Sequence, residues 1–329
     1  MLIYFVRRFI LALVTVWAIS VISFAIIQLP PGDFVTAHIA QLQAMGTIVS
    51  QAEAEVLRIE YGLNRPFWVQ YYKWVQRIFE GDFGLAMEYR RPVMEVIGDR
   101  LALTAALTFT SIMFTWILAI PIGIYSAVKQ YSIGDYVFTF FGFLGLALPN
   151  FLLALVVLYI GFVAFSANVG GLFSPEFADA PYNFAKIMDL LNHLWLPSII
   201  LAVAGTAQLI RVLRANLLDE LRKPYVVTAR AKGLSEWRVI MKYPLRVALN
   251  PLISTIGYLL PLIVSGSIIV SVVMSLPTVG PLLLKALLAQ DMFLAGTIIL
   301  MIGIMTVIGT LISDLLLAWI DPRIKLENT

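Results

Sequence analysis

The chain has 329 residues, of which 60% are hydrophobic and 13% are charged, and its mean hydropathy is +0.89. Soluble globular domains contain roughly 25% charged residues, so this composition argues against a water-soluble enzyme. The lack of cysteine excludes disulfides and thiol chemistry, and two histidines give little basis for a metal site. A net charge of +3 does not indicate nucleic-acid binding. We therefore expect an integral membrane protein.

Six segments are long and apolar enough to cross a bilayer, which requires about 20 such residues. They are Phe9–Pro30, one within Leu101–Val128, one within Tyr136–Phe165, Leu194–Ile210, Leu249–Met274, and one from about Leu294 to Ile320. The first is longer than the apolar core of a signal peptide and no small-residue cleavage site follows it, so we expect it to be retained. The sequence predicts an all-helical protein with six transmembrane helices.

The distribution of lysine and arginine predicts that both termini are cytoplasmic, because cytoplasmic loops carry an excess of these residues. With the N-terminus inside, the cytoplasmic segments hold Arg7, Arg8 and a dense basic cluster at residues 211–246. The two short external loops hold only Lys186 and Lys285. Long loops translocate largely regardless of charge, so the mixed charges of the first external segment do not affect this orientation.

These boundaries divide the chain into a first transmembrane helix (1–30), an external module (31–100), a five-helix transmembrane domain (101–320) and a cytoplasmic tail (321–329). In the external module, aromatic residues recur at helical spacing between 67 and 75, which predicts an amphipathic helix. Such an aromatic face suits the membrane interface, which we favour, or the recognition of an external partner.

A cytoplasmic loop at 211–250 is predicted to form a helix, a sharp turn and a short second helix. Residues 216–232 are rich in helix formers, but Pro224 must kink or divide them and Gly233 ends them. Ser235 is a suitable N-cap for a helix over Glu236–Met241. The loop also carries four apolar residues among its charges: Leu234, Trp237, Val239 and Ile240. Exposed apolar side chains on a short helix need a docking partner, whereas a simple solvated loop would not carry them.

Motifs for catalysis are missing from the sequence. It contains no phosphate-binding loop, no serine-hydrolase elbow and no zinc-protease motif, so we expect a non-catalytic chain that binds no cofactor or metal itself. Among the predicted spans, only the last contains a charged residue, Asp314. An ion-driven secondary transporter or a membrane-embedded enzyme would normally need several polar or ionisable groups there, so these two classes are the unfavoured alternatives.

Residues 225–235, with the sequence YVVTARAKGLS, closely resemble the EAA loop of binding-protein-dependent ABC importer permeases, and in particular the dipeptide/oligopeptide transport family. Further similar segments follow in the family's order over almost the whole chain. They include Tyr61-Gly62-Leu63, Gly81-Asp82-Phe83-Gly84, Leu148-Pro149-Asn150-Phe151, His193-Leu194-Trp195-Leu196-Pro197 and Asp321-Pro322-Arg323-Ile324. Each segment is weakly specific, but their order and spacing together are strongly specific.

The resemblance implies a multi-pass permease in a bacterial or archaeal plasma membrane. Its partners would be a second homologous permease subunit, two cytoplasmic ABC ATPase subunits that bind ATP and magnesium, and an external substrate-binding protein. The lipid bilayer surrounds it, and no nucleic acid is implied. In the family, the short helix of the EAA loop docks on the ATPase. Carried over to this chain, the ATPase-coupling residues are Ala229, Gly233, Leu234, Ser235, Glu236 and Trp237.

The cargo implied by the resemblance is short peptides, with oligosaccharides as the alternative. The alternative arises because Ser271 stands where peptide permeases commonly have glutamate and Thr278 where they commonly have glycine. A second departure is Val227, where the wider family has an acidic residue. It removes an ionic contact at that position but leaves the shape of the coupling loop unchanged.

A translocation pathway is predicted along the fifth transmembrane helix, where Ser254, Tyr258 and Ser265 share one face. Asn150 and Gln208 could join them in a polar cavity. Small and hydroxyl residues are also enriched where membrane helices pack, so helix packing is an equal alternative for this face. For a second ridge of the same helix we favour packing: Ser267, Ser271 and Ser275.

Overall fold

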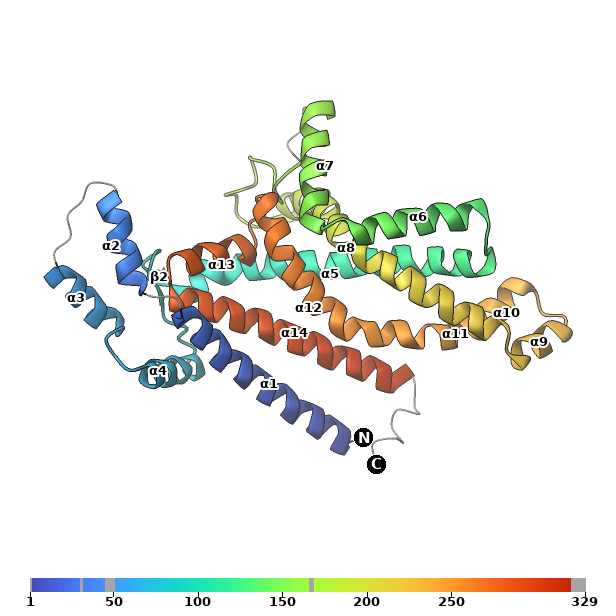
Figure 1. Cartoon of the computed structure of the whole chain (residues 1–329), viewed down its shortest axis with the longest axis horizontal. Coiled ribbons are helices and arrows are strands. Elements are labelled where there is room, and N and C mark those ends of the chain that lie inside the picture. Colours follow the sequence, from blue (N-terminus) through green and yellow to red (C-terminus); the bar gives the residue numbers. More distant parts are fainter. Residues whose placement is uncertain (1, 30–31, 45–50, 166–168, 321–329) are drawn as a thin grey trace. The chain divides into compact units, whose positions relative to one another are not determined.

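The described part of the chain is mostly helical in the computed structural model (Figure 1), as the sequence predicts. The structure describes residues 2–29, 32–44, 51–165 and 169–320, so the predicted tail at 321–329 lies outside it. The chain forms two compact units. Unit 1 comprises Met1–Phe5, Thr104–Pro277 and Ile308–Thr329, and unit 2 comprises Val6–Leu103 and Thr278–Val307.

Unit 2 consists of most of the first helix, the segment after it and parts of two later helices. Its elements are α1 (Leu2–Gln28), α2 (Phe34–Ala44), α3 (Gln51–Tyr61), α4 (Phe67–Phe79), the antiparallel strands β1 (Leu85–Ala86) and β2 (Arg91–Pro92), the start of α5, α13 (Val279–Leu288) and the start of α14. The strands pair Leu85 with Pro92 and Ala86 with Arg91.

Unit 1 is built around the long helix α8. Its elements are most of α5 (Val93–Val128), α6 (Ile133–Ala147), α7 (Asn150–Phe165), α8 (Phe184–Leu221), α9 (Pro224–Ala231), α10 (Glu236–Lys242), α11 (Pro244–Ala248), α12 (Asn250–Val273) and the end of α14 (Met292–Ile320). Helices α5 and α8 approach closely at Gly123, where a Cβ would lie 2.9 Å from Cδ2 of Leu213. A buried apolar cluster, including Leu209, Leu217 and Leu259, joins α5, α8 and α12.

Four helical segments are long and apolar enough to cross a membrane: Val6–Gln28, Val93–Val128, Phe184–Leu221 and Met292–Leu315. Helices α6 and α7 form a bent pair that adds a fifth if it counts as one broken span. Many side chains on these helices are apolar and exposed, such as Trp17, Ile117 and Phe162. Contact with lipid explains these exposed apolar surfaces, so the chain is a multi-pass membrane protein.

The segment expected to form the third crossing is not one straight helix. Helices α6 and α7 meet at an angle of 105° (Figure 1), with Leu148 and Pro149 between them. Leu148 has φ −90° and ψ 125°, the extended conformation that a following proline favours. Proline also cannot donate the amide hydrogen bond that would continue the helix. Pro149 was the signal for a break in the sequence, but the size of the bend depends on the backbone conformation at Leu148.

Helix α8 is longer than the predicted fourth crossing at both ends. Its 38 residues span about 57 Å, and it includes part of the expected external loop and about the first quarter of the expected cytoplasmic loop. Near its C-terminal end, Arg214 donates from Nε and Nη2 to the two carboxylate oxygens of Asp135, at 3.2 and 2.9 Å. Asp135 lies in the first turn of α6. The ion pair therefore ties the extension of α8 to the start of α6.

The predicted aromatic helix of the external module is α4, and its aromatic residues divide between two faces. Trp74 is 1% exposed and stacks on Phe24 of α1, with ring centroids 5.4 Å apart. The hydroxyl of Tyr71 hydrogen-bonds Ser20 of α1 at 2.8 Å. Trp68 and Tyr72 instead remain exposed. One aromatic face therefore packs inside unit 2, which neither sequence interpretation anticipated.

Candidate functional site

The segment between α8 and α12 folds as a helix, a turn and a second helix, as predicted. Pro224 occupies the first position of α9, where its missing amide hydrogen costs nothing, and thereby separates α9 from α8. Helix α10 begins after Ser235, although the Ser235 side chain makes no capping hydrogen bond. In Figure 1, α9 and α10 lie beyond the C-terminal end of α8.

The turn between α9 and α10 depends on Gly233. Its φ of +76° lies in the left-handed region, which other residues adopt at a cost of roughly 1–2 kcal/mol. No atom lies within 4 Å of the position that a Cβ would occupy, so the backbone conformation, and not space, favours glycine. The Gly233 amide donates to the carbonyl oxygen of Arg230 at 2.9 Å, which closes the end of α9.

A salt bridge spans this turn. Arg230 donates from Nε and Nη2 to the two carboxylate oxygens of Glu236, at 3.0 and 2.6 Å. The hydrogen bond from Arg230 holds the pKa of Glu236 below its usual value. Both side chains are about half exposed, so the pair contributes at most about 1 kcal/mol to stability. Its two-pronged geometry fixes the orientation of α10 relative to α9.

A small apolar core holds the two helices together. It consists of Val226, Ala229 and Val239, with Leu234 and Tyr243 packed against it. Val239 and Ile240 are 0% and 3% exposed, so the expectation that both are available for docking is wrong. The sequence interpretation treated α10 as an isolated helix, whereas α9 covers Val239 within the same loop.

Trp237 is the most exposed large apolar side chain of α10, with 66% of its surface exposed, compared with 41% for Met241. It lines an apolar groove of about 380 Å³ together with Ile240 and the C-terminal end of α5. The α5 residues of this groove are Ile120, Pro121, Ile124, Tyr125 and Val128, followed by Lys129. The groove and Trp237 together form a surface that an inserted apolar or aromatic side chain could fill.

Helix α11 anchors the α9–α10 hook to the helices of unit 1. Leu245 and Ala248 of α11 are buried in the same cluster as Leu213 and Leu217 of α8. At the other end of the hook, Tyr225 hydrogen-bonds Glu220, and burial together with this carboxylate raises the pKa of Tyr225 to about 12. Packed side chains therefore connect the hook to α8 and α12.

The six residues expected to couple to an ATPase have different positions in this hook. Ala229 is buried and Leu234 half-buried, so both act in the internal core. Gly233 forms the turn and Glu236 is paired with Arg230. Ser235 and Trp237 are exposed and face away from the core. Gly233 and Glu236 are exposed as well, so among the six only Ala229 and Leu234 are withdrawn from a partner by the internal core.

The predicted pathway residues are only partly described. The side chains of Ser254 and Tyr258 lie outside the described residues. Asn150 begins α7, and its amide nitrogen is 3.6 Å from the Cβ position of Gly266 on α12, beside the exposed Ser265. Gln208 is half-buried on α8. Ser267 and Ser271 are buried, which agrees with helix packing, whereas Ser275 is exposed just after α12. The pathway stays a prediction.

Sequence reasoning missed the two ion pairs and the apolar groove. Arg230 and Glu236 are six residues apart across a glycine turn, and opposite charges flanking Gly233 were the available signal. Asp135 and Arg214 are 79 residues apart, and no sequence signal joins them. Among the described residues, no group of His, Asp and Glu side chains comes together to hold a metal ion.

The chain, including the residues of the hook, matches a known family of membrane proteins. Residues 119–326 match the model of the binding-protein-dependent transport system inner membrane component, and residues 1–108 match the model of that component's N-terminal region. The chain belongs to this family. It is therefore a transport permease subunit and not an enzyme, as the resemblance of the EAA loop implied.

Related proteins match over nearly their whole length. The permease is 36% identical to the oligopeptide transport system permease protein AppB of Bacillus subtilis over 98% of this chain and 99% of the relative. It is 31% identical to the dipeptide transport system permease protein DppB of Alkalihalophilus pseudofirmus over 99% of this chain and 100% of the relative. The identity with DppB of Escherichia coli K12 is 29% over 99% of both chains.

Proposed function

We propose that the permease is one transmembrane subunit of an ATP-driven importer of short peptides, coupled to cytoplasmic ATPase subunits through the α9–α10 hook. The observation that carries this proposal is the exposure of Trp237, which is 66% exposed on the short helix α10. The Arg230–Glu236 salt bridge and the small apolar core shared with α9 hold this helix in place. Exposed aromatic side chains on rigid supports are typical anchors of protein interfaces.

The membrane arrangement that fits this role has six crossings and both termini inside. In this arrangement the four apolar spans, the bent α6–α7 pair and the 24-residue α12 would form the six crossings. Helix α12 would span about 36 Å, enough for the hydrocarbon core. This arrangement places the basic hook in the cytoplasm, in agreement with the excess of lysine and arginine there.

Peptides are the favoured cargo because the relatives similar over full length are called oligopeptide and dipeptide permeases. The oligosaccharide alternative rested on Ser271 and Thr278. These side chains are 0% and 2% exposed, so neither offers a hydroxyl to a cargo molecule in this conformation. The presence of Ser271 and Thr278 at these positions is therefore only weak evidence against a peptide cargo.

The proposed coupling is tested with Trp237→Ala in proteoliposomes that contain the partner permease, both ATPase subunits and the external binding protein. Removing a central aromatic anchor typically costs about 2 kcal/mol or more, so cargo-stimulated ATP hydrolysis should fall at least about tenfold. Lys223→Ala is the matched control, because Lys223 is exposed in the same hook and makes no side-chain capping bond.

Equal stimulation in Trp237→Ala and in the wild type, at equal amounts of inserted protein, would contradict the coupling role. Peptide uptake by the permease in liposomes without any ATPase subunit would instead support the ion-driven alternative.

A further inference from the structure

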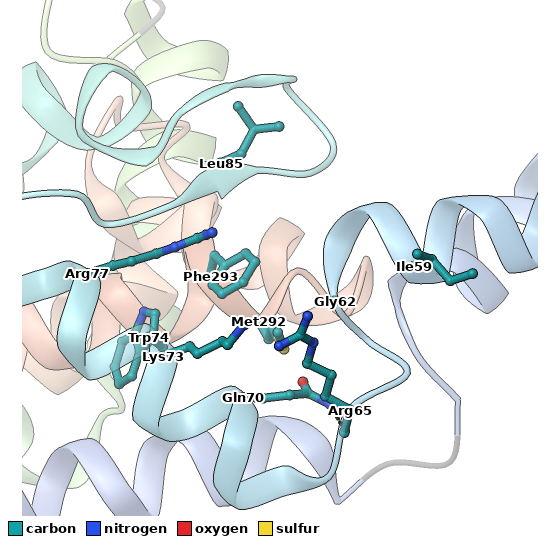
Figure 2. Close-up of a pocket in the computed structure, with 10 residues that line it drawn as sticks. All are labelled: Ile59, Gly62, Arg65, Gln70, Lys73, Trp74, Arg77, Leu85, Met292 and Phe293. Atoms are coloured by element: carbon teal, nitrogen blue, oxygen red, sulfur yellow. Dashed lines mark hydrogen bonds between the residues drawn. The ribbon is translucent and has the colours of Figure 1, made fainter.

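Unit 2 contains a second pocket, separate from the α9–α10 hook. It has a volume of about 370 Å³ and lies along one face of α4 (Figure 2). Trp74, Met292 and Phe293 give it an apolar wall. Three hydrogen bonds brace the Gln70 side chain beside it: Gln70 donates to the carbonyl oxygens of Leu63 and Arg65 and accepts from Gln28. The pocket is therefore a built feature of the unit.

Three cationic side chains line this pocket, and none has an ionic partner among the described residues. Figure 2 shows Arg65, Lys73 and Arg77 extending toward the space beside Met292 and Phe293. None of the three side chains forms a hydrogen bond or ion pair with another described residue, and no described lining residue is acidic. Three positive charges around one cavity repel one another, so the pocket favours an anion.

The apolar wall of the pocket is firmly packed. Trp74 is only 1% exposed and stacks on Phe24 of α1. The pocket thus combines three cations with an apolar wall, which suits an anionic headgroup carried on an apolar body.

The type of anion follows from the charges. A free peptide or a zwitterionic lipid would bring an ammonium group into a pocket that already holds three cations and no acidic lining residue among those described. The repulsion would offset the gain at the negative group. The ligand should therefore carry net negative charge and no nearby cation.

The pocket also lies at the ends of two membrane spans. Helix α4 packs against the last turns of α1, whose apolar span ends at Gln28, and Met292 begins the apolar span of α14. Gln28, the last residue of the α1 span, donates to Gln70 of α4 at 2.9 Å, so the pocket lies at the level where the α1 span ends and the lipid headgroups begin. Trp68 and Tyr72 are exposed on α4, as in interfacial aromatic belts.

We propose that this pocket binds the headgroup of an anionic phospholipid. The phosphate of the lipid is the counter-ion for Arg65, Lys73 and Arg77. The glycerol and acyl carbons of the lipid cover Trp74 and Phe293. An acidic segment of a soluble protein is less suited, because the pocket lies at the depth of the bilayer surface. This site does not depend on the cargo or on ATPase coupling.

The test uses the full-length permease in detergent and titrates it with dioctanoyl phosphatidylglycerol, dioctanoyl phosphatidylcholine or inorganic phosphate. Each lysine or arginine near a lipid surface contributes about fivefold in affinity, so Lys73→Gln combined with Arg77→Gln should weaken phosphatidylglycerol binding by about 25-fold. Arg91→Gln is the control, because Arg91 is an exposed arginine of the same unit outside the pocket. It should bind as the wild type does.

A measurement on the unmodified permease avoids any dependence on folding of the variants. Its affinity for phosphatidylglycerol should fall as ionic strength rises, while its weak affinity for phosphatidylcholine should not change. Equal affinity for both lipids, or for inorganic phosphate and phosphatidylglycerol, would overturn the lipid site. So would unchanged lipid binding in the double variant together with lost capture of the external binding protein, which would assign the pocket to an acidic protein segment.

Discussion

Asp291 shows how a single buried carboxylate can organise part of unit 2. It is 0% exposed, and its Oδ2 accepts a hydrogen bond from the Met87 amide at 2.6 Å. Its Oδ1 accepts from the amide of Leu294, in the first turn of α14, at 3.1 Å. One side chain therefore joins the loop before α14 to the segment after β1. Burial raises its pKa to about 6, although these hydrogen bonds act in the opposite direction.

This pKa predicts a pH dependence of stability. The folded value of about 6 lies above the usual 3.8, so the contribution of Asp291 is fully present below about pH 4 and is lost as the pH rises through about 6. Relative to Asp291→Asn, the wild type should lose up to about 3 kcal/mol across this window. Thermal unfolding of both proteins in detergent, from about pH 4 to about pH 8, measures the difference. Parallel pH profiles would contradict it.

Local sequence signals predicted the elements of the hook well, because they act on neighbouring residues. Pro224 cannot sit inside a helix without losing a hydrogen bond, and Gly233 alone tolerates the left-handed turn without strain. The burial of Val239 could not be predicted in the same way. It depends on Val226, which is 13 positions earlier and is brought back by that turn. The bend between α6 and α7 likewise required the backbone at Leu148.

The turn between α9 and α10 should tolerate changes of side chain better than changes of backbone. Gly233→Ala meets no atom within 4 Å and costs about 1 kcal/mol, so stimulated ATP hydrolysis should be reduced only partly. Gly233→Pro fixes φ near −65° and removes the amide that bonds Arg230, so stimulation should be abolished while the protein still inserts.

Hydrolysis assays of both variants, normalised to the amount of inserted permease, make this comparison. Equal activity of the two variants would show that the left-handed turn is not needed.

At the scale of the whole molecule, composition was enough to predict a helical membrane protein, because apolar surface facing lipid leaves a strong signal in the sequence. The lengths of the crossings were less predictable. Helix α8 continues to Leu221 through a stretch with two arginines and two acidic residues, where the Arg214–Asp135 pair and the packing of Leu213 and Leu217 stabilise it. These contacts join segments that are far apart in the sequence, so the charge pattern of one segment does not predict them.

The central claim is that Trp237 faces the cytoplasm and contacts an ATPase subunit. The chain has no cysteine, so Ser235→Cys introduces a single reactive thiol beside an intact Trp237, on an exposed residue of the same hook. We expect a photoreactive maleimide on this thiol to crosslink the ATPase in the assembled importer, and the same reagent on Arg91→Cys to leave the ATPase unlabelled. Crosslinking of the Ser235→Cys thiol to the external binding protein, or no ATPase crosslink in an active importer, would contradict the account.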